Sequence, residues 1–188
     1  MPTNLPNLIT LLRIVLIPLI VGVYYAPDSW LAWEGKNLAA TAIFIFAAVT
    51  DWLDGYLARR LNQMSAFGAF FDPVADKLVV VGALVVLLTL GRVDMVVGLI
   101  IIGREIAISA LREWMAQLGQ AKSVAVAYVG KVKTAVQMVA IPLLLYEDAL
   151  FEVVDCHALG TVLIYVAAVL TVVSMLYYLR RALPLLRS

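Results

Sequence analysis

The stretch from Asp51 to Asp76 decides the interpretation of this chain. It reads Asp51-Trp-Leu-Asp54-Gly55-Tyr-Leu-Ala58-Arg59, then eight residues, Gly68, three residues, Asp72, three residues and Asp76. Four carboxylates fall within 26 residues, although the other long segments of the chain are almost wholly apolar. Unpaired acids are costly in such surroundings, so we expect a partner that holds them together. A divalent cation fits best.

The first two acids should share one face of a helix. In a helix over residues 40–61, at about 100° per residue, Asp54 lies about 60° from Asp51 around the axis, and Gly55 and Ala58 lie closer still. The same stripe carries mostly small side chains upstream, whereas the bulky side chains point the other way, as suits a lipid-facing surface. The stripe contains Phe44, Ala47 and Ala48, and the opposite face contains Phe46, Trp52, Leu53 and Tyr56.

The other two acids should open the next helix. A short turn that holds Gly68 precedes Asp72, which we expect to be the N-cap, with Pro73 at the first helical position. Asp76 follows four residues after Asp72 and therefore shares its face. Two helices can thus direct two carboxylates each at one point.

Hard carboxylate oxygens suit magnesium or manganese, which often bridge phosphate oxygens. The predicted metal ligands are Asp51, Asp54, Asp72 and Asp76. Four acids suffice for two ions, the arrangement that stabilises the attacking and leaving oxygens of phosphoryl chemistry. Arg59 lies one turn beyond the first acids, where it can meet a phosphate. The alternative interpretation makes the four acids helix caps and interfacial salt-bridge partners.

Composition predicts a membrane protein of one domain, residues 1–188. Hydrophobic residues make up 64% of the chain and charged residues only 14%, and the mean hydropathy is +0.98. This is too apolar for a soluble core of this size and indicates several membrane spans. Cys156 is alone, so the chain has no internal disulfide, and His157 has no matching ligand cluster.

The predicted fold class is an all-α integral membrane protein with six transmembrane helices. Polar or glycine-containing connections separate six apolar segments, and no internal repeat is evident. The expected spans cover residues 8–25, 38–61, 73–90, 95–118, 128–146 and 157–179.

The basic residues predict the orientation of these spans. With the amino terminus on the cytoplasmic side, most basic residues lie at that surface, and the opposite loops are acidic. The chain is then a multi-pass membrane protein, with both termini and the predicted active site on the cytoplasmic side. The basic residues on that side are Arg59, Arg60, Lys122, Lys131, Lys133, Arg180, Arg181 and Arg187, and the opposite loops hold only Lys36 and Arg92.

Further basic residues approach the predicted site. Arg104 and Arg112 lie in the fourth span, and Lys131 and Lys133 open the fifth. Arg104 would lie deepest and needs an anionic partner, which we expect from another helix or from a substrate, because the neighbouring Glu105 points elsewhere. One interpretation is a basic pocket for a phosphorylated acceptor; the alternative is positive charge gathered at the cytoplasmic ends of helices. Arg13, near the start of the first span, either extends to the headgroups or reaches the acids or a lipid phosphate.

The pattern Asp-x2-Asp-Gly-x2-Ala-Arg-x8-Gly-x3-Asp-x3-Asp resembles the signature of the CDP-alcohol phosphotransferases, with all eight positions present. The segment from Asn7 to Arg13 resembles the opening of many members of that family. The segments beginning at Gly103 and Val129 are similar to the branch that uses sn-glycerol 3-phosphate as its acceptor.

This resemblance implies a phosphatidyltransferase that joins CDP-diacylglycerol to sn-glycerol 3-phosphate and releases CMP. It implies that Asp76 is the catalytic base and that Thr10, Gly55, Ala58, Arg59 and Gly68 line the CDP site. Arg104, Arg112, Lys131 and Lys133 would hold the acceptor phosphate. Membrane lipids and a second copy of the chain are the expected partners, and no nucleic acid is expected.

Three alternatives remain at this point. The acceptor can instead be an inositol phosphate, serine or phosphatidylglycerol. An ion-coupled transporter with intramembrane acids would show internal repeats and broken helices, which we do not find in the sequence. An intramembrane prenyltransferase would space its paired acids differently.

Overall fold

The computed structural model describes residues 5–61, 66–119, 128–150 and 153–186. Over these residues the chain forms six helices and one short antiparallel hairpin. The elements are α1 (Leu5–Tyr25), α2 (Trp33–Leu61), α3 (Ala66–Thr89), α4 (Met95–Gln117), α5 (Tyr128–Tyr146), β1 (Ala149–Leu150), β2 (Val154–Asp155) and α6 (Cys156–Leu186). The predicted all-helical architecture is confirmed, whereas the hairpin between α5 and α6 was not expected.

The connection between α3 and α4 illustrates how local sequence sets the element boundaries. Gly91 takes a φ of +70°, in the left-handed region where glycine carries no penalty. Asp94 then caps α4, because its side chain accepts hydrogen bonds from the backbone N–H of Val96 at 2.8 Å and of Val97 at 3.4 Å. The fourth helix therefore begins at Met95, as predicted.

The predicted start of the third helix is wrong. Helix α3 begins at Ala66, so Gly68, Asp72 and Pro73 lie within it, and Asp72 is not an N-cap. Pro73 removes one intrahelical hydrogen bond. In an apolar medium, however, ending the helix there would leave several more backbone groups without partners.

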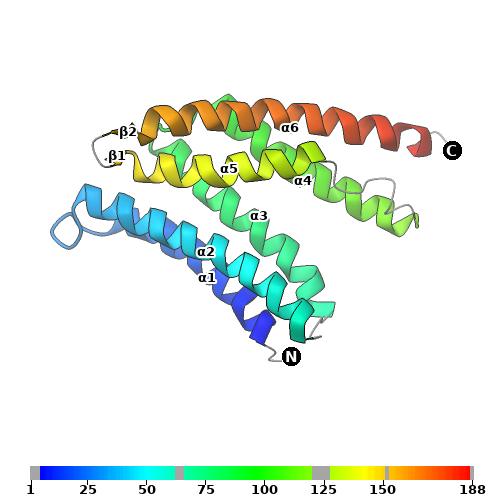
Figure 1. The fold of residues 1–188 in the computed structure, drawn as a ribbon, viewed down its shortest axis with the longest axis horizontal. Coiled ribbons are helices and arrows are strands. Elements are labelled where there is room, and N and C mark those ends of the chain that lie inside the picture. The colour runs from blue at the N-terminus through cyan, green and yellow to red at the C-terminus, as the bar shows by residue number, and fades with distance from the viewer. Residues whose placement is uncertain (1–4, 62–65, 120–127, 151–152, 187–188) are drawn as a thin grey trace.

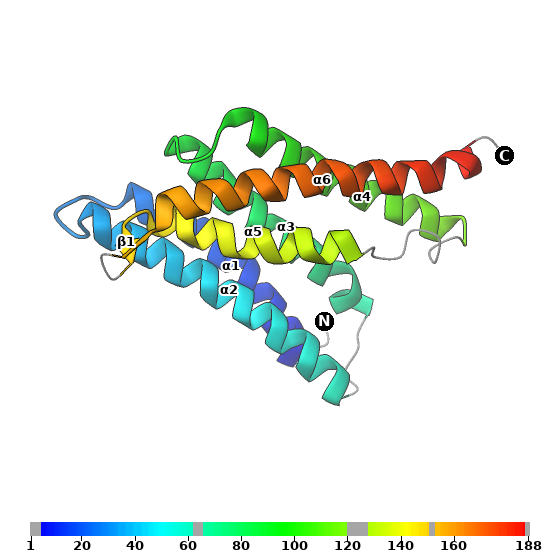
Figure 2. The ribbon, with the colours of Figure 1, turned by 45° about the horizontal axis from the view of Figure 1, so that its top comes forward.

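The helices form two groups that diverge toward one end of the molecule. Helices α5 and α6 run side by side with α4 beneath them, and α1 packs along α2 (Figure 1). Helix α3 packs along α1 and leads across to α4, so that it joins the two groups (Figures 1 and 2). The carboxyl end of α2 and the amino end of α5 therefore lie apart (Figures 1 and 2).

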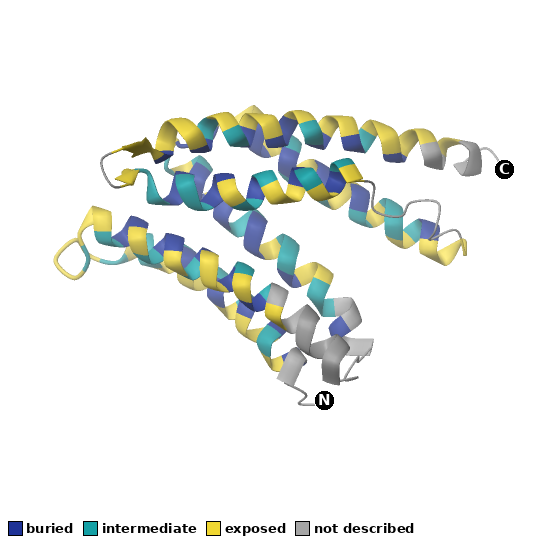
Figure 3. Cartoon of the chain, in the orientation of Figure 1, coloured by how far each residue is buried: buried dark blue, intermediate teal, exposed yellow. Residues whose placement is uncertain are grey.

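The outer surface of the molecule is largely apolar, and several polar side chains are buried. Large apolar side chains cover much of the outer surface, including Val15, Leu99 and Val169, which are more than 60% exposed, and exposed positions line the outer flanks of the helices (Figure 3). Arg13, Lys133 and several hydroxyl groups are instead buried. This distribution suits a chain that is surrounded by lipid and keeps its polar groups inside.

Three of the described helical stretches are long and apolar enough to cross a bilayer. They are Asn7–Tyr25, Tyr128–Tyr146 and Cys156–Arg180. One apolar core joins all six helices, with members such as Phe44 in α2, Leu87 in α3 and Leu144 in α5.

Arg92 ties three helix ends together at the end of the molecule where the two groups meet. Its guanidinium donates to the carbonyl oxygens of Leu144 at 3.1 Å and Leu145 at 2.8 Å, and to the side-chain oxygen of Asn37 at 2.9 Å. It also forms an ion pair with Glu147, which has an unfavourable φ of 67°. Arg92 therefore satisfies carbonyl groups in the last turn of α5 that have no partner within that helix.

We expect Arg92→Gln to lower the free energy of unfolding by about 3 kcal/mol, because the change leaves a buried ion pair and several acceptors without their donor. Thermal unfolding of the detergent-solubilised protein measures the loss. Arg180→Gln is the matched control, since Arg180 is exposed on α6. Equal midpoints for the two variants would contradict this role of Arg92.

Candidate active site

One arginine joins three of the four predicted acids. The Nη1 atom of Arg13 lies 2.6 Å from Oδ1 of Asp51 and also forms an ion pair with Asp76, and its Nη2 atom lies 3.7 Å from Oδ1 of Asp72. The Arg13 side chain is only 1% exposed, whereas the three acids are 40–42% exposed. Of the two interpretations of Arg13, the structure therefore supports the one in which it reaches the acids.

Helical periodicity brings these groups together from three elements. Asp72 and Asp76 are one turn apart on α3 and face the same guanidinium. Ala47 and Phe44 are buried and place the Asp51 stripe of α2 inward, while Phe46 and Leu53 are exposed, as the helical periodicity predicted. Thr10 of α1 donates its hydroxyl to Oδ1 of Asp72 at 2.6 Å, and thereby reaches the acids as well.

Several predicted residues lie outside the described side chains. The backbones of Asp54, Gly55, Ala58 and Arg59 belong to α2, but their side chains fall outside the described part of the structure. Gly68 is buried within α3.

A cavity of about 120 Å³ connects the acids to basic residues on the other helix group. Asp51, Asp76 and Lys77 line it from α2 and α3, whereas Glu105 of α4 and Lys133 of α5 line it from the opposite group. The cavity therefore spans the gap between the two groups of helices. Both cations and anions face it, as a site for a charged and phosphorylated molecule requires.

The basic residues of the second helix group are paired with Glu105. Arg104 donates from Nη1 to Oε1 of Glu105 at 3.2 Å, and Lys133 forms an ion pair with the same oxygen. The prediction that Glu105 points away from Arg104 is wrong, because two long side chains can bend toward each other across the roughly 100° that separates neighbours on a helix. Arg104 also donates to the Ser174 hydroxyl of α6 at 3.2 Å.

Of the four predicted acceptor residues, only Lys133 is among the residues that line this cavity. Arg112 donates to the hydroxyl of Tyr178 at 3.2 Å, and its guanidinium lies 5.3 Å from the centre of that ring. Lys131 is exposed on α5. Residues two positions apart on a helix are separated by about 200° around its axis, so Lys131 and Lys133 face nearly opposite sides. Only Lys133 of these two lines the cavity together with the acids.

Sequence reasoning missed four polar residues that line the cavity. Lys77 directly follows Asp76 in the acidic stretch, and Gln137 follows Lys133 by one helical turn, so spacing could have found both. Thr134 also lines the cavity, and Glu105 does so with its charge already engaged. Gln137 is buried, and its amide oxygen has no hydrogen-bond partner among the described residues.

The acids fit a divalent cation by their chemistry and convergence. Among the described residues, no group of three or more His, Cys, Asp or Glu side chains is arranged to hold a metal ion. The Asp54 side chain lies outside the described part of the structure. Asp51, Asp72 and Asp76 nevertheless converge on the single cation of Arg13. Their hard oxygen atoms are the ligands that magnesium and manganese prefer.

Comparison with known proteins identifies the family. The sequence model of the CDP-alcohol phosphatidyltransferase family matches residues 3–173. Relatives from Escherichia coli (strain K12) and Shigella flexneri serotype 5b (strain 8401) are each 49% identical over 190 residues, which cover 97% of this chain and 96% of the relative. Both relatives are named CDP-diacylglycerol–glycerol-3-phosphate 3-phosphatidyltransferase. The chain belongs to the CDP-alcohol phosphatidyltransferase family.

We expect Arg13→Gln to lower the free energy of unfolding by about 2 kcal/mol, because three acids would repel one another without the central cation. The loss should be smaller than for a fully buried pair, since the acids reach water. Thermal unfolding in detergent without added divalent ions measures it, and Arg180→Gln again controls for the loss of one charge. A variant as stable as this control would show that Arg13 does not hold the acids together.

Proposed function

We propose that the chain transfers the phosphatidyl group of CDP-diacylglycerol to sn-glycerol 3-phosphate, which yields phosphatidylglycerophosphate and CMP for acidic phospholipid biosynthesis. The observation that carries this proposal is the cavity between the two helix groups. It is lined by Asp51 and Asp76 on one side and by Lys133 on the other. The two relatives that are 49% identical to this chain are named for the same donor and acceptor, CDP-diacylglycerol and glycerol 3-phosphate.

The enzyme would use one or two magnesium or manganese ions. Asp51, Asp54, Asp72 and Asp76 are the residues that would hold them, and the convergence of three of these acids on Arg13 supports the assignment. When bound, such ions neutralise negative charge on the bridging and leaving oxygens of a pyrophosphate.

The acids and bases of the cavity would have separate tasks. Lys133 and Arg104 would bind the phosphate of the acceptor, and this would direct its hydroxyl group toward the acids. The Asp76 carboxylate would take the proton of that hydroxyl while the hydroxyl oxygen of the acceptor attacks the phosphatidyl phosphorus. The bond from phosphorus to the CMP oxygen then breaks, and CMP leaves with the electron pair. Arg112 and Lys131 remain predicted acceptor-binding residues.

The CDP group would lie beside α1, α2 and α3. Thr10 is the described residue that supports this placement, because its hydroxyl is bonded to Asp72. The small residues Gly55, Ala58 and Gly68 would let the nucleotide approach the backbone, and Arg59 would meet one of its phosphates.

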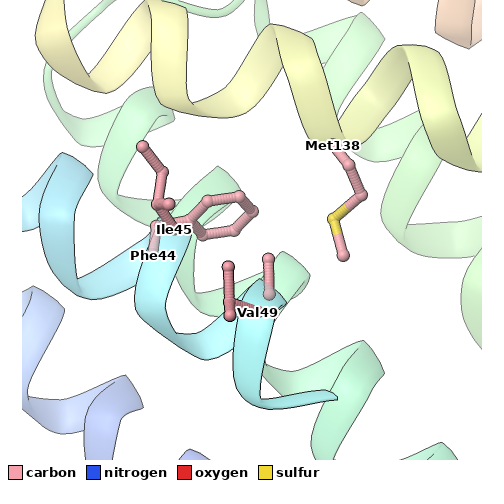
Figure 4. Close-up of a pocket in the computed structure, with 5 residues that line it drawn as sticks. Phe44, Ile45, Val49 and Met138 are labelled. Carbon is pink, nitrogen blue, oxygen red and sulfur yellow. The ribbon is translucent and has the colours of Figure 1, made fainter. Parts of the chain in front are cut away.

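The acyl chains of the lipid would leave the site between α2 and α5. Met138 lines the polar cavity and also an apolar cavity of about 270 Å³, where its side chain extends toward Phe44 and Val49 of α2 (Figure 4). A further apolar cavity of about 430 Å³ shares Ile45 and Met138 with it. Such a path would keep the chains in apolar surroundings while the headgroup meets the acids.

We further propose that all six helices span the bacterial inner membrane, with both termini and the active site at the cytoplasmic side. The excess of basic residues in the corresponding segments supports this orientation. A homodimer is also expected, and light scattering of the purified protein with correction for bound detergent would measure it.

The direct test supplies CDP-diacylglycerol with equal amounts of sn-glycerol 3-phosphate, inositol phosphate, serine and phosphatidylglycerol. We expect phosphatidylglycerophosphate as the main lipid product, together with one CMP for each molecule formed. Mass spectrometry of the lipids and chromatography of the nucleotide measure both products. Another main product would change the assigned acceptor, and no CMP release with any of them would reject the proposed function.

Asp51→Asn and Asp72→Asn should each reduce turnover at least about 100-fold, because each removes a charge that the proposed ions and the charged transition state require. Both variants should still insert into membranes and purify. Asp148→Asn is the matched control, since Asp148 is an exposed acid in the loop at the other end of α5. Near-normal activity of either site variant would reject the assignment of these acids.

A further inference from the structure

Glu105 occupies a position in the cavity that nothing in the proposed reaction requires. Its Oε1 atom accepts a hydrogen bond from Arg104 at 3.2 Å and forms an ion pair with Lys133. The Glu105 side chain is 15% exposed, and the Lys133 side chain is 2% exposed. Two buried cations thus share one carboxylate oxygen, and of these Lys133 lines the cavity together with Glu105.

The shared oxygen explains how the cations can stay inside the protein before a substrate binds. A buried ammonium or guanidinium group without an anionic partner is strongly destabilising. Glu105 of α4 is that partner both for Lys133 of α5 and for Arg104, which lies in α4 as well. It gives one negative charge to two positive ones, so the three groups together still attract an anion.

An incoming phosphate monoester would compete with Glu105 for the same cations. The phosphate carries a charge between about −1.5 and −2 at neutral pH. It therefore repels a carboxylate that binds the same cation. The repulsion between the two anions therefore favours release of Lys133 from Glu105 when the phosphate binds.

We propose that Glu105 is a positioning residue that takes the place of the acceptor phosphate in the empty site and gives up Lys133 when that phosphate binds. This inference rests on the proposed function in that the acceptor carries a phosphate. It adds to that function a defined exchange of ion pairs within the cavity.

The surrounding contacts indicate which of the two cations moves. Arg104 donates to the Ser174 hydroxyl at 3.2 Å, and Ser174 in turn donates to the carbonyl oxygen of Thr171 at 2.9 Å, so α6 fixes the guanidinium. Lys133 carries a compact charge on a flexible stem with rotatable donors. Lys133 therefore exchanges Glu105 for the phosphate, while Arg104 stays in place.

Inorganic phosphate tests this exchange without turnover. The purified protein in detergent is titrated with phosphate, and the rise in thermal midpoint gives the concentration for half-maximal stabilisation. Glu105→Gln should lower that concentration about tenfold, because the competing charge is gone. Glu113→Gln is the matched control, since Glu113 is an exposed acid on the same helix, and it should bind phosphate as the unmodified protein does. An unchanged or weaker affinity in Glu105→Gln would overturn the proposal.

Two further variants keep the test decisive. In the double variant Glu105→Gln, Lys133→Gln the gain in phosphate affinity should disappear; a gain that persists would mean that Lys133 is not the receiving cation, and would overturn the exchange. Glu105→Asp, whose shorter carboxylate reaches Lys133 less closely, should shift the affinity in the same direction by a smaller factor. It replaces Glu105→Gln if that variant does not purify, and no shift would again overturn the proposal.

Kinetics separates this inference from the proposed function. Glu105→Gln should lower the KM for sn-glycerol 3-phosphate at least about threefold and leave the KM for CDP-diacylglycerol unchanged. Its kcat should fall, since Lys133 is no longer held in position before binding. A raised acceptor KM would show that Glu105 assists acceptor binding instead. If the unmodified protein releases no CMP with this acceptor, the proposed function fails, and the phosphate titration still decides the role of Glu105.

Discussion

The ion pairs of Arg13 with three aspartates are the interaction on which the arrangement of the first three helices depends. Apolar packing alone does not fix the rotation of a helix that is surrounded by lipid, because the lipid is as apolar as the helix surface. Asp51 on α2 and both Asp72 and Asp76 on α3 must face the one buried guanidinium of α1. This requirement sets the rotation of α2 and α3 about their own axes and brings the acids to the cavity.

The second group of helices repeats this principle with the signs reversed. There a single carboxylate, Glu105, lies between the cations Arg104 and Lys133, whereas on the other side a single guanidinium lies between three carboxylates. Opposite charges partly compensate each other in both clusters, which leaves an excess of acids in the first and an excess of cations in the second. The cavity lies between the two clusters. The phosphates of the proposed donor would face the acidic cluster, and the phosphate of the proposed acceptor would face the basic cluster.

Much of the fold was accessible from local sequence, because each apolar segment is long and is separated from the next by polar or glycine-containing turns. The start of α4 followed from the glycine-containing connection before it, and the inward face of α2 followed from helical periodicity. The start of α3 did not, since the signal of Pro73 for a helix start was weaker than the need to pair backbone groups.

The candidate site was predictable as a set of residue types but not as a set of contacts. The acids were found from their spacing, and the contact between Arg13 and the acids was one of two interpretations. The partners of Arg104 include Ser174, which is 70 residues away along the chain, and no local pattern reveals such a contact. Lys131 and Lys133 were grouped by proximity in the sequence, although helical geometry separates them.

The ring of hydrogen bonds around Arg92 has a consequence for how a bulky lipid can enter and leave. That residue fastens the last turn of α5 to the start of α2 and to the α3–α4 connection, at the end of the molecule opposite the acids. A separation of the two helix groups that admits a lipid would therefore be restricted to the other end, where α2 ends and α5 begins.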